Sequence, residues 1–361
     1  MELTRLWLRD FRGYEELEVG FAPGFTALVG PNGVGKTNLL EALSLLSTTR
    51  SFRGAPPDAM IRVGAGLAVV RAEGRRDDRE VLIELELSRQ GRTRVQVNRQ
   101  RLRRARDLLG ALRTTVFTPE DLALVKEGPA LRRDYLDDLL VALEPAVDQV
   151  VSDLERVLRQ RSSLLKQAGG RLDEAAGHTL DVWDHKLAQL GAELTRRRQA
   201  LVTALGPAVD GAYRELAGGS EPVVGLDYQP SWAGDDLGAA LVAARADDVR
   251  RGVSTVGPHR DELAITLAGL AARTQASQGE QRSLALGLRI AGHRFVTDRL
   301  GEAPLLLLDD VLSELDPHRS RALLDRLPPG QVVITSAQDL PPAARTDRLL
   351  RFDGGRLREV A

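Results

Sequence analysis

Residues 30–37 constrain the fold of this chain more than any other segment. They fit the pattern G-x-x-x-x-G-K-[ST] and lie between an apolar stretch at 25–29 and a helical pattern that begins at 37. The residues are Gly30, Pro31, Asn32, Gly33, Val34, Gly35, Lys36 and Thr37. In such a loop the backbone N–H groups surround phosphate oxygens, and the N-terminus of the next helix adds positive potential. The segment predicts a nucleotide site in which Lys36 reaches the β- and γ-phosphates and Thr37 binds Mg²⁺.

Two consecutive carboxylates follow the apolar stretch 305–308. A buried strand there would deliver Asp309 and Asp310 at its carboxyl end, where ligands bind in open parallel sheets. We expect Asp309 to hold Mg²⁺, directly or through water, and Asp310 to orient an attacking water. Capping of the next helix is the alternative role, but Asp316 followed by Pro317 is a better N-cap and first turn for that helix.

The pentapeptide Ser277-Gln278-Gly279-Glu280-Gln281 precedes an amphipathic pattern that runs from about 281 to 300. Ser277 and Glu280 fit a capping box, in which each side chain satisfies a backbone N–H of the first helical turn. The same residues fit the signature motif of ABC-type ATPases, in which a Ser and a Gly, here Ser277 and Gly279, bind the γ-phosphate held by the opposite subunit. The two interpretations are compatible, and the position of the motif one helix before the Asp309 strand favours the second.

Changes in hydrophobic periodicity indicate an α/β domain interrupted by a helical lobe. Alternating residues predict strands at about 2–10, 14–21 and 25–29, then a β-meander at 67–98 with a turn at 90–92. A period of 3.6 residues follows from about 119 to 251, with breaks at Gly169-Gly170, Gly206-Pro207 and Gly218-Gly219. Strand and helix patterns then alternate at about 263–267, 281–300, 305–308, after Pro317, and at 332–335. We therefore expect an ATPase domain formed by residues 1–118 and 252–361, and an inserted helical lobe at 119–251.

The composition indicates where such a chain works. It has no Cys, which excludes disulfides and thiolate metal sites and fits a reducing compartment. We expect a cytoplasmic protein without a membrane segment, because the first residues lack a signal-peptide pattern and no apolar segment approaches the roughly 18 residues of a span. Fifty basic and 51 acidic residues leave a net charge of −1, so any nucleic-acid surface must be a local patch.

One segment is basic enough to form such a patch. Between positions 89 and 106 the chain contains no acid and these arginines: Arg89, Arg92, Arg94, Arg99, Arg101, Arg103, Arg104 and Arg106. Their contacts with DNA phosphates would be independent of sequence and sensitive to salt. We take Arg99, Arg101, Arg103 and Arg104 as the candidate DNA contacts. The alternative is a solvated hairpin, or one paired with acids elsewhere in the fold. No aromatic residue lies in the segment, which disfavours a base-stacking platform.

Together these motifs resemble those of the RecF family, bacterial recombination mediator ATPases related to the heads of SMC proteins. The resemblance rests on the phosphate loop and on the segments around Ser277 and Asp309, and it extends from one end of the chain to the other. Further matches are Arg50-Ser51-Phe52-Arg53, Pro119-Glu120, Gly128-Pro129, Arg132-Arg133-Asp134-Tyr135-Leu136-Asp137 and Gly257-Pro258-His259-Arg260-Asp261.

The chain departs from related patterns at three places. The family pattern usually has Gly at the position of Glu127, and transport ATPases have Glu where this chain has Asp310. No His follows the strand that ends at Thr335. Ser336 or Gln338 would therefore have to sense the γ-phosphate.

The resemblance implies a two-lobed ABC head that binds ATP and Mg²⁺ and forms an ATP-dependent homodimer on DNA, at gaps and at double-strand to single-strand junctions. It implies that RecO and RecR act with the protein to help load the recombinase RecA, in support of repair, replication restart and the SOS response. ATP hydrolysis would be slow, stimulated by DNA, and used as a switch. Lys36, Asp310 and either Ser336 or Gln338 would be the catalytic residues.

Two other classes share parts of this pattern. A transport ATPase is disfavoured by Asp309-Asp310, by the missing His, and by the opening Leu8-Arg9-Asp10-Phe11-Arg12, which resembles that of SMC and RecF proteins. A structural SMC-like clamp needs very long antiparallel helices. The pattern between 119 and 251 predicts helices of at most ~22 residues, or ~33 Å at 1.5 Å per residue, too short for such an arm.

Overall fold

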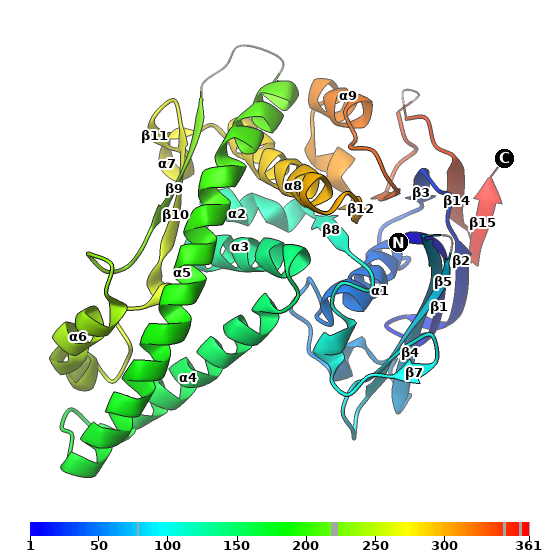
Figure 1. Ribbon diagram of the computed structural model, residues 1–361. Coiled ribbons are helices and arrows are strands. Elements are labelled where there is room, and N and C mark those ends of the chain that lie inside the picture. Colours follow the sequence, from blue (N-terminus) through cyan, green and yellow to red (C-terminus); the bar gives the residue numbers. More distant parts are fainter. Residues whose placement is uncertain (78, 218–222, 342–343, 354–355, 361) are drawn as a thin grey trace. The chain divides into compact units, whose positions relative to one another are not determined.

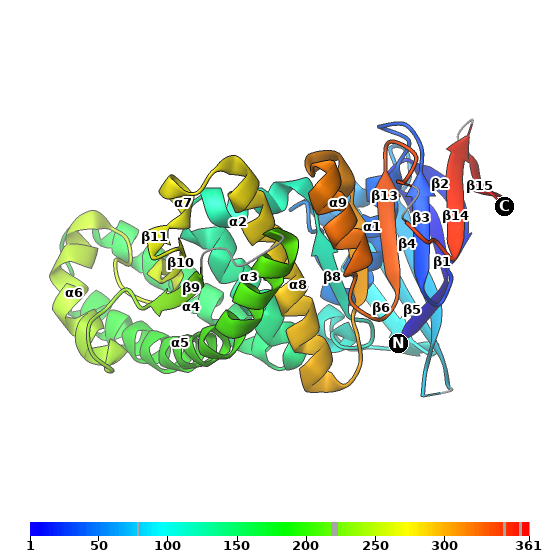
Figure 2. The ribbon, with the colours of Figure 1, turned by 90° about the horizontal axis from the view of Figure 1, so that it is seen from above.

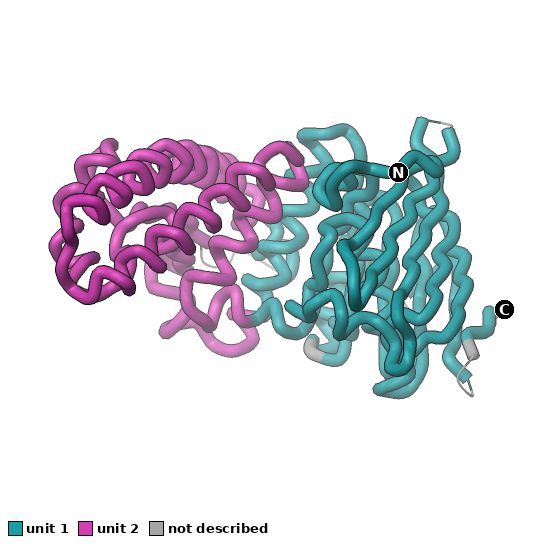
Figure 3. Tube along the Cα trace, turned by 90° about the horizontal axis from the view of Figure 1, so that it is seen from below, with its two compact units in different colours: residues 1–122, 212–221, 282–361 teal, residues 123–211, 222–281 magenta. Residues whose placement is uncertain are grey.

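The computed structural model describes residues 1–77, 79–217, 223–341, 344–353 and 356–360. The chain divides into two compact units (Figure 3): unit 1 contains residues 1–122, 212–221 and 282–361, and unit 2 contains residues 123–211 and 222–281. The second unit therefore extends further along the chain than the lobe expected at 119–251. The reason is a strand pairing: the strand expected at 263–267 pairs with a strand of unit 2 and not with the phosphate-loop sheet.

The first sheet of unit 1 carries the phosphate loop (Figures 1 and 2). Its strand order is β15-β14-β3-β13-β12-β8, parallel throughout except for β15. The strands are β3 (Phe25–Val29), β8 (Thr114–Phe117), β12 (Leu305–Asp309), β13 (Val332–Ser336), β14 (Arg348–Asp353) and β15 (Arg356–Val360). Every residue of β3, β12 and β13 is buried, as expected for parallel strands that are covered on both faces.

The second sheet of unit 1 is the expected β-meander, extended by the two N-terminal strands. Its order is β2-β1-β4-β5-β6-β7, with all pairs antiparallel. The strands are β1 (Glu2–Phe11), β2 (Tyr14–Gly20), β4 (Leu67–Arg76), β5 (Arg79–Ser88), β6 (Arg94–Val97) and β7 (Gln100–Arg101). Alternate residues such as Ala68, Val70 and Ala72 are buried, so one face of this sheet packs on the core and the other meets solvent.

Helix α1 (Lys36–Thr48) follows the phosphate loop and packs against both sheets (Figure 1). Its leucines, among them Leu39 and Leu43, share one core with Leu6 of β1 and Leu307 of β12. The helix predicted to begin at 37 is thus confirmed, and burial of its apolar residues fixes the loop relative to the strands on either side. Unit 1 also contains α9 (Pro317–Asp325) and most of α8 (Gln278–Leu300).

Short 3-10 turns join several of these elements. They are η1 (Pro57–Met60), η2 (Ala105–Leu108), η3 (Pro119–Leu122) and η5 (Val311–Glu314) in unit 1, and η4 (Pro258–Arg260) in unit 2. The N-cap predicted for the helix after Pro317 is confirmed, because the Asp316 carboxylate accepts a hydrogen bond from the Arg319 N–H at 2.9 Å.

Unit 2 is mainly helical but also contains a small sheet, which the sequence analysis missed. The helices are α2 (Ala123–Lys126), α3 (Pro129–Leu143), α4 (Val147–Ala168), α5 (Glu174–Ala217, which ends in unit 1), α6 (Leu237–Arg251) and α7 (Ala272–Gln275). The sheet has the order β11-β10-β9, formed by β9 (Val224–Gln229), β10 (Glu262–Leu267) and β11 (Leu270–Ala271). None of the helices in the described ranges is long and apolar enough to cross a membrane.

Helix α5 corrects the prediction of helices no longer than ~22 residues, because it has 44 residues and continues through Pro207. A proline inside a helix costs about 3 kcal/mol. An apolar stripe on both sides of it offsets that cost, because Leu201, Leu205, Val209 and Ala212 are all buried. The break predicted at Gly169-Gly170 is confirmed, since Gly169 adopts a left-handed conformation at the end of α4. The break predicted at Gly218-Gly219 lies outside the described residues.

Buried charges hold unit 2 together. Arg161 of α4 is fully buried and pairs at 2.7 Å with Asp184 of α5 and at 2.7 Å with Asp248 of α6. Asp261, the last residue of the motif at 257–261, is also fully buried and accepts hydrogen bonds from the Tyr228 hydroxyl at 2.5 Å and the Thr195 hydroxyl at 3.1 Å. Removing one member of such a network would leave an uncompensated buried charge, so these residues fix the packing of this unit.

The packing of unit 1 predicts a pH dependence through His293 of α8. This side chain is 1% exposed and lies 3.1 Å from the Thr115 hydroxyl of β8, and burial lowers its pKa from 6.5 to about 4. Between those pH values the unfolded chain binds a proton that the folded chain does not, so stability falls as the pH falls from 6.5 to 4. This single group accounts for a loss of about 3 kcal/mol over the window. Urea unfolding of the wild type and of His293→Gln at several pH values checks it: the free-energy difference between them should change by about that amount, and a constant difference would contradict the assignment.

Candidate nucleotide-binding site

The phosphate loop joins β3 to α1, and its conformation depends on two glycines. Gly33 and Gly35 have φ values of 83° and 109°, in the region that side chains other than glycine rarely adopt. A Cβ atom on Gly35 would also stand 2.6 Å from the Tyr14 hydroxyl, which donates a hydrogen bond to the Gly35 carbonyl at 3.0 Å. The loop therefore keeps its backbone N–H groups turned inward only with glycine at these positions.

The Lys36 side chain is drawn into the loop that precedes it. It is 6% exposed, and its ammonium donates to the Gly30 carbonyl at 2.6 Å and to the Pro31 carbonyl at 2.9 Å. An ammonium has three donors, so one remains for a phosphate. Burial lowers the Lys36 pKa, and the nearby carboxylates of Asp310 and Asp309 oppose that shift. A bound polyphosphate would supply the negative charge that this buried cation lacks.

Asp309 at the end of β12 is held by two hydroxyl groups. The Thr37 hydroxyl donates to its Oδ1 at 3.0 Å and the Thr335 hydroxyl at 2.7 Å. Burial, and to a smaller extent the charges of Asp310 and Glu120, raise the pKa of Asp309, while the two hydroxyl bonds oppose the shift. A buried carboxylate beside hydroxyl oxygens is an oxygen-ligand set of the kind that Mg²⁺ prefers, and a divalent cation there would reverse the cost of ionising Asp309.

Asp310 leaves the strand direction immediately after Asp309. It adopts a left-handed conformation with φ 47°, and its backbone N–H donates to the Thr335 hydroxyl at 3.0 Å. Its Oδ1 accepts a hydrogen bond from the Ala337 N–H at 3.3 Å, and its side chain makes no cap bond to η5. The Asp310 side chain therefore does not act as a helix cap, which was the alternative role. Its carboxylate borders the same cavity as the phosphate loop.

The two candidate switch residues form a turn at the end of β13. The Ser336 hydroxyl donates to the Gln338 carbonyl at 2.7 Å and accepts from the Gln338 N–H at 3.2 Å. The Ser336 carbonyl accepts from the Gly30 N–H at 3.2 Å, which ties this turn to the start of the phosphate loop. Ser336 is buried and Gln338 is exposed. Their role toward a γ-phosphate stays a prediction.

These groups enclose a cavity of ≈ 320 Å³. Its lining residues are Asn32, Gly33, Gly35, Lys36, Thr37, Asn38, Arg53, Asp309 and Asp310. Sequence reasoning missed Arg53 and Asn38 as lining residues, and it missed the Thr335 bond to Asp309. A sequence signal for Thr335 was present. Thr335 ends the strand predicted at 332–335, just as Asp309 follows the strand predicted at 305–308, and these two strands are neighbours in the sheet. Arg53 was noted only within the family match at 50–53, with no indication of a place at the cavity, since it follows α1 by several residues and returns to the loop through tertiary packing.

Ser277 and Gly279 lie at the start of α8, in unit 2. The capping box is present: the Glu280 carboxylate accepts from the Ser277 N–H at 2.6 Å, and the Ser277 hydroxyl accepts from the Glu280 N–H at 3.3 Å. This geometry leaves the signature role open, because an exposed N-terminus with a hydroxyl and a glycine still suits an anion.

The arginine-rich segment is less uniform in space than in sequence. Arg89 donates to backbone carbonyls of the loop before β4, and Arg94 pairs with Glu86 of the adjacent β5 at 3.1 Å. Arg104 pairs with Asp107 at 2.9 Å. Of the four candidate DNA contacts, Arg99, Arg101 and Arg103 are exposed and have no ion-pair partner within the described part of the chain. Acids of the adjacent strand β5 and of the following turn η2 thus neutralise part of this arginine-rich segment.

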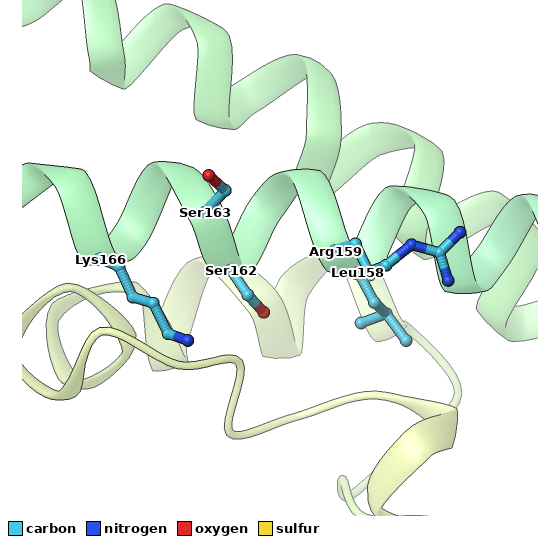
Figure 4. A pocket seen from close by; sticks show the side chains of 5 residues that line it. All are labelled: Leu158, Arg159, Ser162, Ser163 and Lys166. Carbon is cyan, nitrogen blue, oxygen red and sulfur yellow. The ribbon is translucent and has the colours of Figure 1, made fainter.

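A second hollow, of ≈ 380 Å³, lies along α4 in unit 2 (Figure 4). It is lined by Leu158, Arg159, Ser162, Ser163 and Lys166, all from this one helix. Arg159 is partly neutralised by Glu155, one turn earlier, at 3.5 Å. All residues that line this hollow thus come from one helix, whereas three separate segments (residues 32–38, 53 and 309–310) converge on the cavity of unit 1.

A phosphate loop between a parallel strand and a helix, with the carboxylate of Asp309 from β12 at the same edge of the sheet, defines a P-loop NTPase of the ABC-type head class. A family model described as the RecF/RecN/SMC N-terminal domain matches residues 2–346. The chain belongs to the RecF family of DNA replication and repair proteins, and both the fold class and the family expected from its motifs are confirmed.

Individual relatives agree with this placement. The DNA replication and repair protein RecF of Streptomyces avermitilis is 46% identical over 355 residues, which cover 94% of each chain. RecF of Kineococcus radiotolerans is 43% identical over 389 residues, which cover 99% of this chain and 100% of the relative. A solved structure of the recombination mediator RecF-ATPrS in the RecFOR pathway has a TM-score of 0.91 at 29% identity, covering 99% of this chain and 98% of that one. An SMC head bound to the C-winged helix domain of ScpA shares the fold, with a TM-score of 0.60 at 19% identity, covering 100% of this chain and 97% of that one.

The geometry of Lys36 generates a direct test. Lys36→Met should weaken binding of ATP about a hundredfold, because a charge-assisted bond to phosphate is lost inside a water-poor loop. Isothermal titration calorimetry with Mg²⁺ and ATP measures this affinity. Lys186→Met is the matched control, since Lys186 lies over the Trp183 ring in unit 2 and should not alter the affinity. Unchanged affinity in Lys36→Met would refute the assignment of the loop.

Proposed function

We propose that this protein is an ATP-dependent DNA-binding protein of recombinational repair, in which ATP closes a homodimer on DNA and slow, DNA-stimulated hydrolysis releases it. The observation that carries the nucleotide part is the arrangement around Asp309. The Thr37 and Thr335 hydroxyls meet on its Oδ1, and the buried Lys36 ammonium borders the same cavity. A triphosphate with its cation supplies both of the charges that this arrangement lacks.

Each residue around the cavity would have a distinct task. Residues 30–37 would hold the phosphates through backbone N–H groups and Lys36, and Thr37 with Asp309 would hold Mg²⁺. When bound, Mg²⁺ supplies positive charge that stabilises the phosphate oxygens. Asp310 would accept a hydrogen bond from the attacking water and orient it, and Ser336 or Gln338 would sense the γ-phosphate. Solved RecF structures that contain ATPrS or ATP support the choice of nucleotide.

The partners follow from the family and not from a contact in this chain. The relatives are DNA replication and repair proteins, and a solved relative is described as a recombination mediator of the RecFOR pathway. We infer that RecO and RecR are partners, that RecA is loaded indirectly, and that the DNA target is a single-stranded gap or a junction with duplex DNA. Roles in replication restart and SOS induction, and a cytoplasmic location, stay predictions on the same basis.

The alternatives are weaker. The chain belongs to the RecF family and not to the transport ATPases. An SMC-like clamp needs long antiparallel helices, and α5, with 44 residues, is longer than the sequence pattern predicted. However, its ion-paired neighbour α4 has 22 residues, which limits an antiparallel pairing of the two to ~33 Å.

Ser277 offers the sharpest test of dimerisation. If Ser277 and Gly279 complete the nucleotide site of the opposite subunit, Ser277→Arg should leave ATP affinity of the monomer nearly unchanged and block ATP-dependent dimerisation. An arginine there is bulky and adds positive charge to a helix N-terminus that is already positive. Sedimentation velocity with saturating ATP and Mg²⁺, with and without gapped DNA, measures the result.

The control separates assembly from helix capping. Asp236→Ala removes the side-chain cap of α6 in the same unit, and should cost about 1 kcal/mol of stability without changing assembly. Ser277→Thr retains a hydroxyl and should dimerise. If Ser277→Arg forms the dimer as the wild type does, the signature role is wrong.

The exposed arginines predict a change in salt dependence. Replacing Arg99, Arg101 and Arg103 together with Gln removes three candidate phosphate contacts. The slope of log K against log salt on duplex DNA should become shallower by roughly 2 to 3 units. Fluorescence anisotropy at several salt concentrations checks this. Arg104→Gln is the matched control, because its partner Asp107 already neutralises it, and its slope should be the same as that of the wild type. A normal slope in the triple variant would assign these arginines to a solvated face.

A further inference from the structure

Glu41 is a fully buried carboxylate that none of the nucleotide-binding roles above uses. It lies in the middle of α1, one and a half turns after Lys36, and its side chain has no exposed surface. A buried carboxylate is strongly unfavourable unless charged or polar partners compensate for it. Its surroundings must therefore contain the reason for its presence.

Both oxygens of Glu41 are occupied. Oε2 accepts from the Arg12 Nε at 2.7 Å, and Oε1 accepts from the Arg12 Nη2 at 2.6 Å. Oε1 also accepts from the Ser51 hydroxyl at 2.5 Å. The bidentate pair with Arg12 supplies strength and a fixed direction. The bond to Ser51 uses a lone pair that the guanidinium leaves free.

The Arg12 side ties α1 to the β-meander. Arg12 lies in the turn between β1 and β2 with φ 54°, and its backbone N–H donates to the Met60 carbonyl at 2.7 Å. Its Nη1 donates to the Ala59 carbonyl at 2.9 Å. These contacts join the β1–β2 turn and η1 to helix α1, so we expect the Arg12–Glu41 ion pair to stabilise the fold of unit 1.

The Ser51 side leads back to the nucleotide cavity. The Ser51 hydroxyl accepts from the Arg53 N–H at 3.1 Å, which closes a tight turn after α1. The Arg53 guanidinium then lies on the lining of the cavity, with its Nη1 3.4 Å from the Asn38 Oδ1. Arg53 is exposed, and no ion pair fixes it within the described ranges. Its position therefore depends on the turn that Ser51 and Glu41 hold.

We propose that Glu41 is a positioning residue for the nucleotide site, and that it acts through Ser51 to hold the Arg53 guanidinium at the phosphate cavity. The proposal rests on the proposed binding of ATP. It assigns two separable tasks to one carboxylate: the Arg12 pair secures the fold, and the Ser51 bond secures the direction in which Arg53 approaches the phosphates.

A double-mutant cycle tests this coupling, with ATP and Mg²⁺ as the probe in calorimetric titration. Arg53→Gln should weaken ATP binding about tenfold, through loss of one charge-assisted bond. Ser51→Ala should weaken it about three- to tenfold although Arg53 is still present. In the double variant the loss should be no larger than in Arg53→Gln alone, because Ser51 acts only through Arg53. Losses that multiply in the double variant would overturn the proposal.

Two further variants exclude a merely structural role. Thr48→Ala removes a hydroxyl whose hydrogen bonds near the end of α1 go to Ser44 and Arg50 and not to Glu41. It should lower the melting temperature without changing ATP affinity. Ser51→Thr retains the hydroxyl and should restore binding to within about twofold of the wild type. If Ser51→Ala lowers only the melting temperature, as Thr48→Ala does, the positioning role is wrong.

Failure of this proposal and failure of the proposed function give different results. If Lys36→Met binds ATP as the wild type does, the nucleotide site is refuted whatever Ser51 does. If Lys36→Met loses ATP and the Ser51 and Arg53 effects multiply, the site stands and the positioning role of Glu41 fails.

Discussion

Lys36 and Asp309 carry opposite charges, are both buried, and are each held by neutral oxygen atoms. The ammonium is bound by the Gly30 and Pro31 carbonyls, and the carboxylate is bound by the Thr37 and Thr335 hydroxyls. Burial favours the neutral form of both groups: it lowers the pKa of Lys36 and raises the pKa of Asp309. This shared desolvation is the physical basis of the proposed nucleotide site: an anion alone would relieve only Lys36 and a cation alone only Asp309, whereas a metal-bound polyphosphate would relieve both.

The parallel register of three strands produces this pairing. Val29 lies opposite Ser336, and Thr335 lies opposite Asp309, so the carboxyl ends of β3, β13 and β12 meet at one edge. The polar residues beyond each end converge there, although β3 and β12 are far apart in sequence. Most of the long intervening segment belongs to unit 2, which has its own buried charges and its own small sheet.

Helix α1 extends the influence of the site into the rest of unit 1. Its first turn carries Lys36 and Thr37, its apolar residues join the core of both sheets, and Glu41 ties it to the β1–β2 turn and to the segment that bears Arg53. The same β-meander carries the exposed Arg99 and Arg101, so α1 packs against the sheet that bears two of the candidate DNA contacts.

The sequence by itself determined the phosphate loop, the strand with its two carboxylates, the β-meander, the capping box at Ser277 and the family. Each of the structural features depends on local spacing, so residues close in sequence carry its signal, and the family follows from several such local motifs along the whole chain. Tertiary structure alone decided that Glu86 neutralises Arg94 and that Arg53 returns to the cavity, because no local pattern relates the segments that these contacts join. For Thr335 the predicted strand was a signal, and the structure supplied the hydrogen bond to Asp309. The length of α5 was also decided there: Gly206-Pro207 is a break by local propensity, and only the burial of the apolar stripe on both sides keeps the helix continuous.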